Sequence, residues 1–295
     1  MSDYYVLYEG TQYEVANFDA GVAKAKELGS SAVLYVNGDG AYTSDLYAQG
    51  VNLAFTGGII SVTGGTSSGT MATGTLYTGF AADQTGAVAN QSILLDGGTI
   101  AGNLTFGSLA GGSTVQNVEV TLRDGYIDGW LTGANLDPNG SVTINLLGGN
   151  AKEFFCSSVT PADTQGDTII NIDGIDRAGK YVYCSYRSAP KSLTVNVKSG
   201  YVYVLSSGGN ANLADGIVME TPVVINMTGG SVGYLLGGAY QWVTMKGSIS
   251  GISPYGLTWT KMWKGTAKVK VLILISSGDS TSEVSFRNIK VTEVK

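Results

Sequence analysis

Short apolar runs in which every second position is polar recur along most of the chain. In residues 142–146, for example, Val142, Ile144 and Leu146 alternate with Thr143 and Asn145. Successive side chains of a strand point to opposite faces, so the three aliphatic residues share one face and the two polar residues share the other. The pattern predicts a strand whose aliphatic face is buried and whose polar face is exposed.

Similar runs begin roughly every 24 to 30 residues, which is a period typical of stacked repeats. A Gly or Gly-Gly turn follows each run, and a second apolar run follows the turn. The aligned runs begin at Ser92, Val118, Val142, Thr168, Leu193 and Val223. Two or three short parallel strands per repeat predict the coils of a β-solenoid.

Four successive repeats carry asparagine at the same position of the run. Stacking predicts an interior aliphatic column of Ile144, Ile170, Val195 and Ile225 beside an outward column of Asn145, Asn171, Asn196 and Asn226. Neighbouring members of a column would lie about 4.8 Å apart, so their amides could hydrogen-bond to one another. Two interpretations remain open: the asparagines stabilise the strand surface, or they form a binding face.

The two ends of the chain differ from the repeats. Residues 17–28 have helical periodicity, with Asn17 as the N-cap and Gly29 after the last turn, and they predict an amphipathic helix within an N-terminal cap, 1–30. The coils are expected over 31–250. Residues 251–295, rich in Lys and Trp, are expected to form a C-terminal cap or an assembly segment, because an open solenoid end exposes apolar side chains. The Gly-rich segment 59–88 predicts irregular coils or a lateral loop.

Composition narrows the function classes. The net charge of −6 argues against nucleic-acid binding, which needs clustered Lys and Arg. No apolar stretch approaches the roughly 20 residues that cross a bilayer, and the first residues, MSDYYVLYEG, lack the basic and long apolar regions of a secretory signal. We therefore expect no membrane insertion and no signal peptide in the chain.

The candidate chemistry is sparse. Without histidine, Cys/His metal sites and Ser-His triads are excluded, and no cofactor is expected. Cys156 and Cys184 occupy similar places in adjacent repeats, which predicts either two packed thiols or a disulfide. Acidic pairs occur at Asp124 and Asp128, at Asp173 and Asp176, and at Asp163 and Asp167. Because Asp-Gly is common turn chemistry, we interpret these residues mainly as turn formers.

Tyrosines recur in the second apolar run of successive repeats. They are Tyr181, Tyr183, Tyr186, Tyr201, Tyr203, Tyr234 and Tyr240. Tyrosine rings can stack on sugars, so Tyr183 and Tyr203 are candidates for glycan binding together with the Asn column. The alternative is that these rings form core and surface ladders that stiffen the stack.

The segments FDAGVAKAKELGSSAVLYVNGDGAY (18–42) and VNLAFTGG (51–58) resemble the N-terminal cap and first coil of pectate-lyase-like right-handed parallel β-helices. The later xVxINhxGGxh units resemble coils of bacterial surface adhesins and of phage tail or fibre proteins. The resemblance covers most of residues 15–250. It implies an all-β fold, a right-handed parallel β-helix with a short N-terminal capping helix. Enzymes of this fold act on polysaccharides, either with paired carboxylates or with a Lys or Arg base.

These observations lead us to expect a non-enzymatic structural or adhesive β-helix, a virion component such as a phage fibre, decoration or tail protein. Expected partners are copies of the same chain, with a trimer common in similar proteins, other structural proteins, or a surface glycan. One alternative is a bacterial surface adhesin or filament subunit at the extracellular surface. Another is a tailspike-like polysaccharide hydrolase or lyase that uses Asp124 and Asp173.

Overall fold

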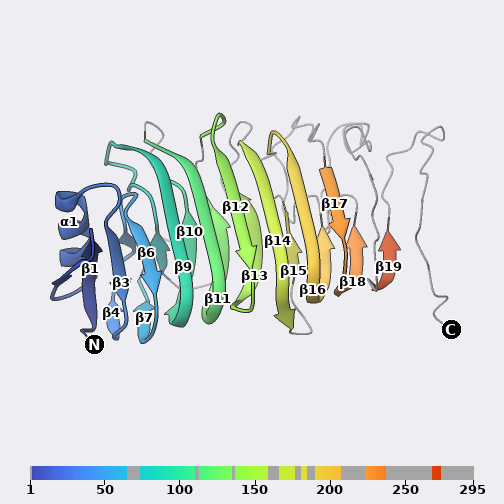
Figure 1. The fold of residues 1–295 in the computed structure, drawn as a ribbon, viewed down its shortest axis with the longest axis horizontal. Coiled ribbons are helices and arrows are strands. Elements are labelled where there is room, and N and C mark those ends of the chain that lie inside the picture. Colours follow the sequence, from blue (N-terminus) through green and yellow to red (C-terminus); the bar gives the residue numbers. More distant parts are fainter. Residues whose placement is uncertain are drawn as a thin grey trace.

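The computed structural model describes residues 2–64, 74–109, 113–134, 137–158, 166–176, 181–184, 190–206, 223–236 and 268–273. These residues form a β-solenoid of parallel stacked coils with a single short helix, which confirms the predicted fold class. The strands on the near side of Figure 1 run downward and those behind them run upward as the chain advances from left to right. The coil is therefore right-handed, the hand that parallel crossover connections favour.

Each coil contributes strand segments to three faces, which we name A, B and C. Face A contains β3 (Val33–Val36), β6 (Asn52–Phe55), β12 (Ser141–Leu146), β17 (Val223–Met227) and the first parts of β9 (Ala87–Ala101), β11 (Thr114–Gly133), β14 (Asp167–Asp176) and β16 (Leu193–Ser206). Face B contains β4 (Gly40–Tyr42), β7 (Ile59–Val62), the last parts of β9 and β14, the middle of β11 and β16, and the first parts of β13 (Asn150–Ser158), β18 (Ser231–Leu236) and β19 (Lys268–Ile273). Face C contains β5 (Leu46–Tyr47), β8 (Thr75–Tyr77), β10 (Asn103–Phe106), β15 (Tyr181–Tyr183) and the last parts of β11, β13, β16, β18 and β19.

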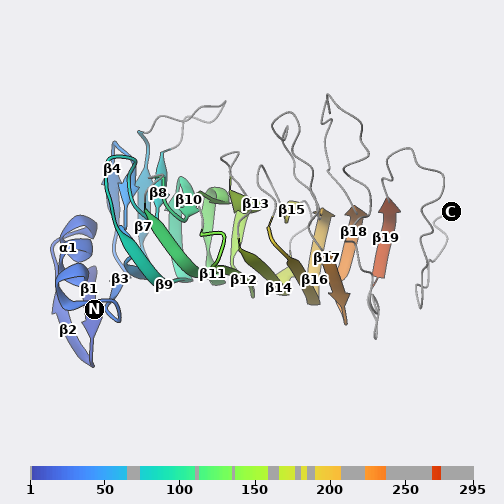
Figure 2. The ribbon, with the colours of Figure 1, turned by 90° about the horizontal axis from the view of Figure 1, so that it is seen from above.

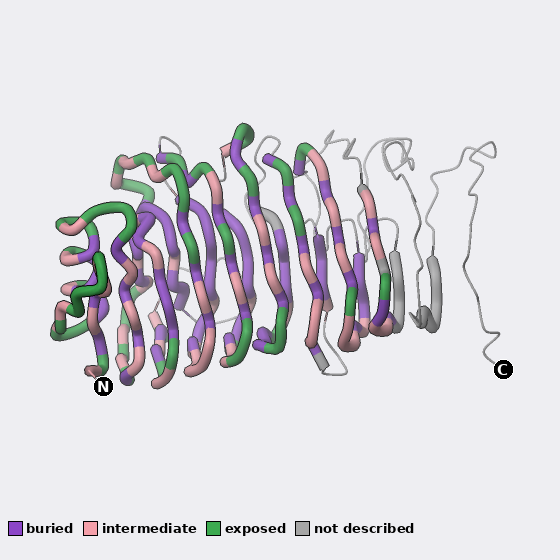
Figure 3. Tube along the Cα trace, in the orientation of Figure 1, coloured by how far each residue is buried: buried purple, intermediate pink, exposed green. Residues whose placement is uncertain are grey.

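The register of face A agrees with the repeat alignment over five of its six runs. Val118, Val142, Thr168, Leu193 and Val223 follow one another in parallel pairing. The interior column of Ile144, Ile170, Val195 and Ile225 is buried, with no member more than 1% exposed. Figure 3 shows the resulting alternation of buried and more accessible positions along the strands.

The alignment of the first run is wrong by one residue. Gln91, not Ser92, pairs with Val118, and Ser92 pairs with Glu119 on the outward side. Gln91 is 2% exposed, so a polar residue occupies an inward position that is aliphatic in the next coil. The apolar run in the sequence begins only after it, at Ile93, and the alignment therefore started one position late.

The turns between faces A and B require glycine for two reasons. At Gly125, φ is +98°, a conformation that L side chains rarely adopt. A Cβ atom added there would lie 2.8 Å from the carbonyl oxygen of Gly97 in the neighbouring coil. The recurrent glycines thus allow both the sharp bend and the close approach of stacked turns.

The N-terminal cap combines a hairpin with a helix. α1 (Phe18–Leu28) has the predicted bounds, because the Asn17 side chain accepts the Ala20 N–H at 2.9 Å and Gly29 follows the last turn. β1 (Tyr4–Tyr8) and β2 (Thr11–Glu14) form an antiparallel hairpin, and β1 also pairs antiparallel with β3. The sequence pattern did not predict this hairpin, whose turn is a weak Glu-Gly signal. Figures 1 and 2 show α1 and the hairpin at one end of the stack.

The structure describes parts of segment 59–88, expected as irregular coils or a lateral loop, and of segment 251–295, expected as a C-terminal cap or an assembly segment. Within 59–88, β7 and β8 pair with β4 and β10 and continue the parallel coils, and residues 65–73 lie outside the described part. Within 251–295, β19 pairs in parallel with β18, and the other residues lie outside the described part. In the described ranges, no helix has the length and hydrophobicity that crossing a membrane requires.

Candidate functional site

The four predicted asparagines form one continuous hydrogen-bonded column on the outer side of face A. Each Nδ2 donates to the Oδ1 of the preceding asparagine, at 2.8 Å from Asn171 to Asn145, 2.9 Å from Asn196 to Asn171 and 3.0 Å from Asn226 to Asn196. At its start, Asn145 donates to Glu119 Oε1 at 2.9 Å and to Thr121 Oγ1 at 3.1 Å. The amides therefore bond to one another, as the stacking predicted.

A second polar column runs beside it on face A. Asn117 donates to Asn90 Oδ1 at 3.0 Å, Ser141 donates through its hydroxyl to Asn117 Oδ1 at 3.0 Å, and Ser192 donates to Asp167 Oδ1 at 2.6 Å. Polar groups that bond within the surface have fewer donors and acceptors left for a ligand. The geometry supports the stabilising interpretation of the Asn column, and its binding role stays a prediction.

The two tyrosine candidates, Tyr183 and Tyr203, do not share a column. Tyr183 is 2% exposed, is stacked on Phe155 with ring centroids 5.0 Å apart, and pairs with Ser206 in the next strand. Tyr203 is half-buried and meets the edge of Tyr181 at 5.6 Å. The Tyr183 ring is thus part of a packed aromatic cluster, in which it is stacked on Tyr181 at 5.9 Å, and Tyr181 in turn meets Tyr203. The role of Tyr183 and Tyr203 in glycan binding stays a prediction.

The predicted neighbours Cys156 and Cys184 are packed thiols, not a disulfide. Both are free and fully buried, and they follow the paired residues Phe155 and Tyr183 in adjacent strands. Burial raises the pKa of each thiol, and the neighbouring Cys156 raises that of Cys184 further. Buried neutral thiols of this kind are poor nucleophiles.

Of the acidic candidates, Asp124 and Asp173 lie at the bends between faces A and B, each before a glycine with positive φ, whereas Asp128, Asp167 and Asp176 lie within strands β11 and β14. Asp124 Oδ1 accepts the N–H of Gly125, and Asp173 Oδ1 accepts the Ser199 hydroxyl at 2.7 Å. Asp124 of β11 pairs with Asp96 of the preceding coil, and Asp173 lies on β14, two coils beyond β11. Asp163 lies outside the described residues. Among the residues that the structure describes, no group of three or more His, Cys, Asp or Glu side chains is placed to hold a metal ion.

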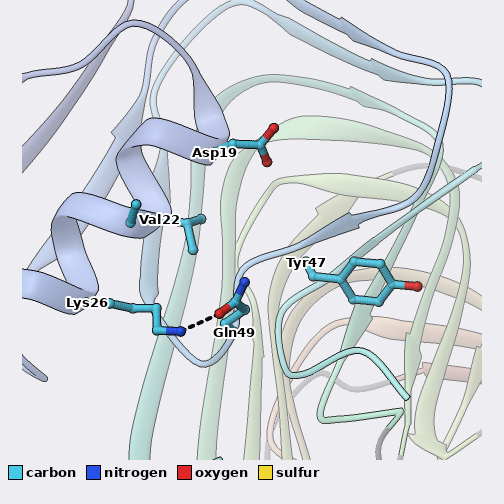
Figure 4. Close-up of a pocket in the computed structure, with 6 residues that line it drawn as sticks. Asp19, Val22, Lys26, Tyr47 and Gln49 are labelled. Carbon is cyan, nitrogen blue, oxygen red and sulfur yellow. Dashed lines mark hydrogen bonds between the residues drawn. The ribbon is translucent and has the colours of Figure 1, made fainter. Parts of the chain in front are cut away.

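A groove beside the cap was not found by sequence reasoning. It has a volume of about 400 Å³ and lies between α1 and the segment that begins with β5. Its lining residues are Asp19, Val22, Ala23 and Lys26 of α1 together with Tyr47 and Gln49. Figure 4 shows the Lys26 ammonium group bonded to the Gln49 side-chain oxygen at one side of the groove. These residues come together only when the helix docks, so the linear pattern gave no signal for them.

Comparisons with known proteins identified no relative of this chain. The evidence for the architecture is the parallel register and the stacked columns described above. No family model, no curated protein and no solved structure matches the chain significantly.

Proposed function

We propose that this protein is a non-enzymatic structural or adhesive β-solenoid that serves as a rigid, exposed scaffold. Its most suitable place is a virion, as a phage fibre, decoration or tail component, or the extracellular surface. The proposal includes a relationship of the repeats to the pectate-lyase-like β-helices of phage and adhesin proteins. It also includes assembly into a homo-oligomer, with a trimer as one form.

The observation that carries the proposal is the Asn column. It links four coils through side-chain amides in addition to the backbone pairing between those coils. Each coil contacts mainly its neighbours, so extra bonds from coil to coil stiffen the stack along its axis. A rigid rod of this kind suits a fibre that projects from a particle or a decoration protein that covers the surface of a particle.

Electron microscopy of the native assembly tests this function. Gold-labelled antibodies against the purified chain should mark an ordered position on a virion or a cell-surface filament, and analytical ultracentrifugation should show a homo-oligomer. A protein found only as a free, unassembled species would contradict the scaffold role. Release of new reducing ends or unsaturated sugars from a panel of polysaccharides would favour the hydrolase or lyase alternative.

A further inference from the structure

We propose that the groove between α1 and β5 binds a neutral saccharide. The proposal deepens the adhesive form of the function above and rests on it. The groove of about 400 Å³ adjoins a second hollow of about 340 Å³, and Lys26 and Gln49 line both. Hollows of this size are within the range of ligand sites, and here one wall is helical and the other belongs to the coils.

The first supporting feature is an aromatic platform. Tyr47 is half-buried and is stacked on Tyr77 of the next coil, with ring centroids 5.2 Å apart and an interplanar angle of 9°. The pairing of β5 with β8 fixes the two rings in register. The face of a tyrosine ring is electronegative, so it attracts the C–H groups on one side of a pyranose ring.

The second feature is a pair of planar polar groups that line the groove together with Tyr47. Asp19 is exposed on α1, and Gln49 offers a side-chain amide. In Figure 4 the Gln49 oxygen bonds to Lys26, and its amide nitrogen is directed away from Lys26 into the groove. A carboxylate that accepts and an amide that donates match sugar hydroxyls, which do both.

The third feature is the backbone of Gln49. Its φ is +51°, and the only other non-glycine residue with positive φ in the described ranges is Glu9, in the β1–β2 turn. Two backbone bonds hold the segment to the next coil: Gln49 N–H to Gly79 O at 3.0 Å and Gly50 N–H to Thr78 O at 2.8 Å. Glycine would fit this conformation without strain, so a glutamine here indicates a use for its side chain.

The charge around the groove selects the class of sugar. Burial, followed by the nearby carboxylates of Asp45 and Asp83, raises the pKa of the Tyr47 hydroxyl. Asp45 is held in place because its Oδ1 accepts the Thr75 N–H at 2.8 Å. The groove itself is lined by one carboxylate, Asp19, and one cation, Lys26, so its lining has no net charge, and the carboxylates of Asp45 and Asp83 add negative charge beside the Tyr47 hydroxyl. An anionic sugar would be repelled, whereas a neutral one would not.

The test is a titration of the full chain with oligosaccharides, and binding is measured by calorimetry and by ligand-observed NMR. The probes are the neutral oligosaccharides cellohexaose, mannohexaose and N-acetylchitohexaose, with hexagalacturonate as the anionic comparison. At least one neutral probe should bind more tightly than hexagalacturonate. Tyr47→Ala and Gln49→Gly should each weaken that binding by about tenfold or more. Gln49→Gly relieves the backbone, so its fold should be retained.

Two matched controls lie outside the groove. Tyr35→Ala removes a ring of the Tyr5–Tyr35 stack on face A, whose centroids are 4.8 Å apart, and Glu9→Gly relieves the other positive φ. Both should change the binding by less than about twofold.

Three results would overturn the groove assignment. They are the absence of binding to any neutral probe, tighter binding of hexagalacturonate than of every neutral probe, and wild-type affinity in both Tyr47→Ala and Gln49→Gly. Wild-type affinity in both variants would mean that the saccharide binds at another site, and the adhesive function would remain supported. An ordered position on a particle without any saccharide binding would leave only the scaffold function.

Discussion

At the scale of single residues, Gln91 illustrates how a polar group is accommodated in the interior of a solenoid. Its Nε2 donates to the carbonyl oxygens of Val51 and Thr78, at 3.0 and 2.7 Å, and its Oε1 accepts the Thr78 hydroxyl at 2.9 Å. A buried polar group is tolerated when it is bonded, and removal of one partner leaves the others unsatisfied. Gln91 therefore fastens face A to the loop after β8.

Replacement of Gln91 by leucine should destabilise the protein despite the added apolar surface. The Val51 carbonyl and the Thr78 hydroxyl would lose their bonds to Gln91, and the Thr78 carbonyl would keep its bond from the Gly50 N–H, so the expected cost is about 1 to 3 kcal/mol in the free energy of unfolding. Urea denaturation followed by circular dichroism measures this cost. Gln116→Leu, at an exposed position of β11, is the control and should stay within about 0.5 kcal/mol of the wild type. Equal stabilities of the two variants would contradict this role.

The buried thiols predict a pH dependence of stability. Burial raises the pKa of Cys156 and Cys184 above the value of about 8.5 expected in the unfolded chain. Above that pH the unfolded chain loses protons that the folded chain keeps. The stabilisation is therefore complete below about pH 8.5 and declines as pH rises toward the folded pKa, by up to about 1.4 kcal/mol per pH unit for each thiol.

Denaturant unfolding between about pH 7 and pH 9.5 tests this dependence. The wild type should lose more stability over this interval than the double variant Cys156→Ala/Cys184→Ala, in which neither thiol can ionise. Tyrosine ionisation is common to both proteins. Parallel stability curves for the two proteins would show that the thiols do not contribute.

At the scale of elements, the Asn column couples strands that are distant in sequence. Asn171 lies inside the column, donating to Asn145 and accepting from Asn196, whereas the interior side of the same strands packs aliphatic residues. The four coils of the Asn column are thus joined to one another by three kinds of contact: backbone pairing, apolar packing inside and amide bonds outside. An asparagine of this column can form the amide bond only when the next coil has an asparagine at the paired position.

Asn171→Ala should lower the free energy of unfolding by about 1 to 2 kcal/mol, because two side-chain hydrogen bonds are lost at a half-buried site. Chemical denaturation gives the value. Thr194→Ala, which changes a half-buried outward residue of the neighbouring coil, provides the comparison and should have a smaller effect. If the threonine variant were the less stable of the two, the amide ladder would not be a main stabiliser of face A.

At the scale of the whole molecule, the fold is close to one-dimensional. β11 pairs with β9 and β10 on one side and with β12 and β13 on the other, whereas among the described strands β2 pairs only with β1. In such a stack the stability is close to a sum of coil terms and neighbour terms, so the coils at an end have less support than those in the middle. The cap hairpin and α1 supply that support at the N-terminal end.

Hydrogen exchange should therefore show a gradient along the axis. Amides of β11 and β12 on face A should exchange most slowly, and those of β2 most rapidly among the described strands, because opening an end strand breaks one interface and opening a central coil breaks two. Exchange followed by mass spectrometry of peptides measures this. Uniform protection from β2 to β12 would indicate a single cooperative unit instead.

The repeating unit, the buried face of the runs from Val118 onward, the asparagine and aliphatic columns, and the bounds of α1 could all be predicted from the sequence. These features follow from local rules: a period of two, helix caps, and glycine at the turns. The inward glutamine at position 91 was misassigned because its burial depends on partners at Val51 and Thr78, far away in the sequence.

Which outward residues meet depends on the register and docking of the coils, which a linear pattern does not contain. Tyr183 and Tyr203 look equivalent in the sequence, yet register buries the first and leaves the second half-exposed. The groove brings Lys26 of α1 beside Gln49 of a coil, a juxtaposition set by the packing of the helix. Periodicity predicts which side of each segment faces the core. A site between two segments depends on how the segments dock, and docking is determined by contacts between residues that are distant in the sequence.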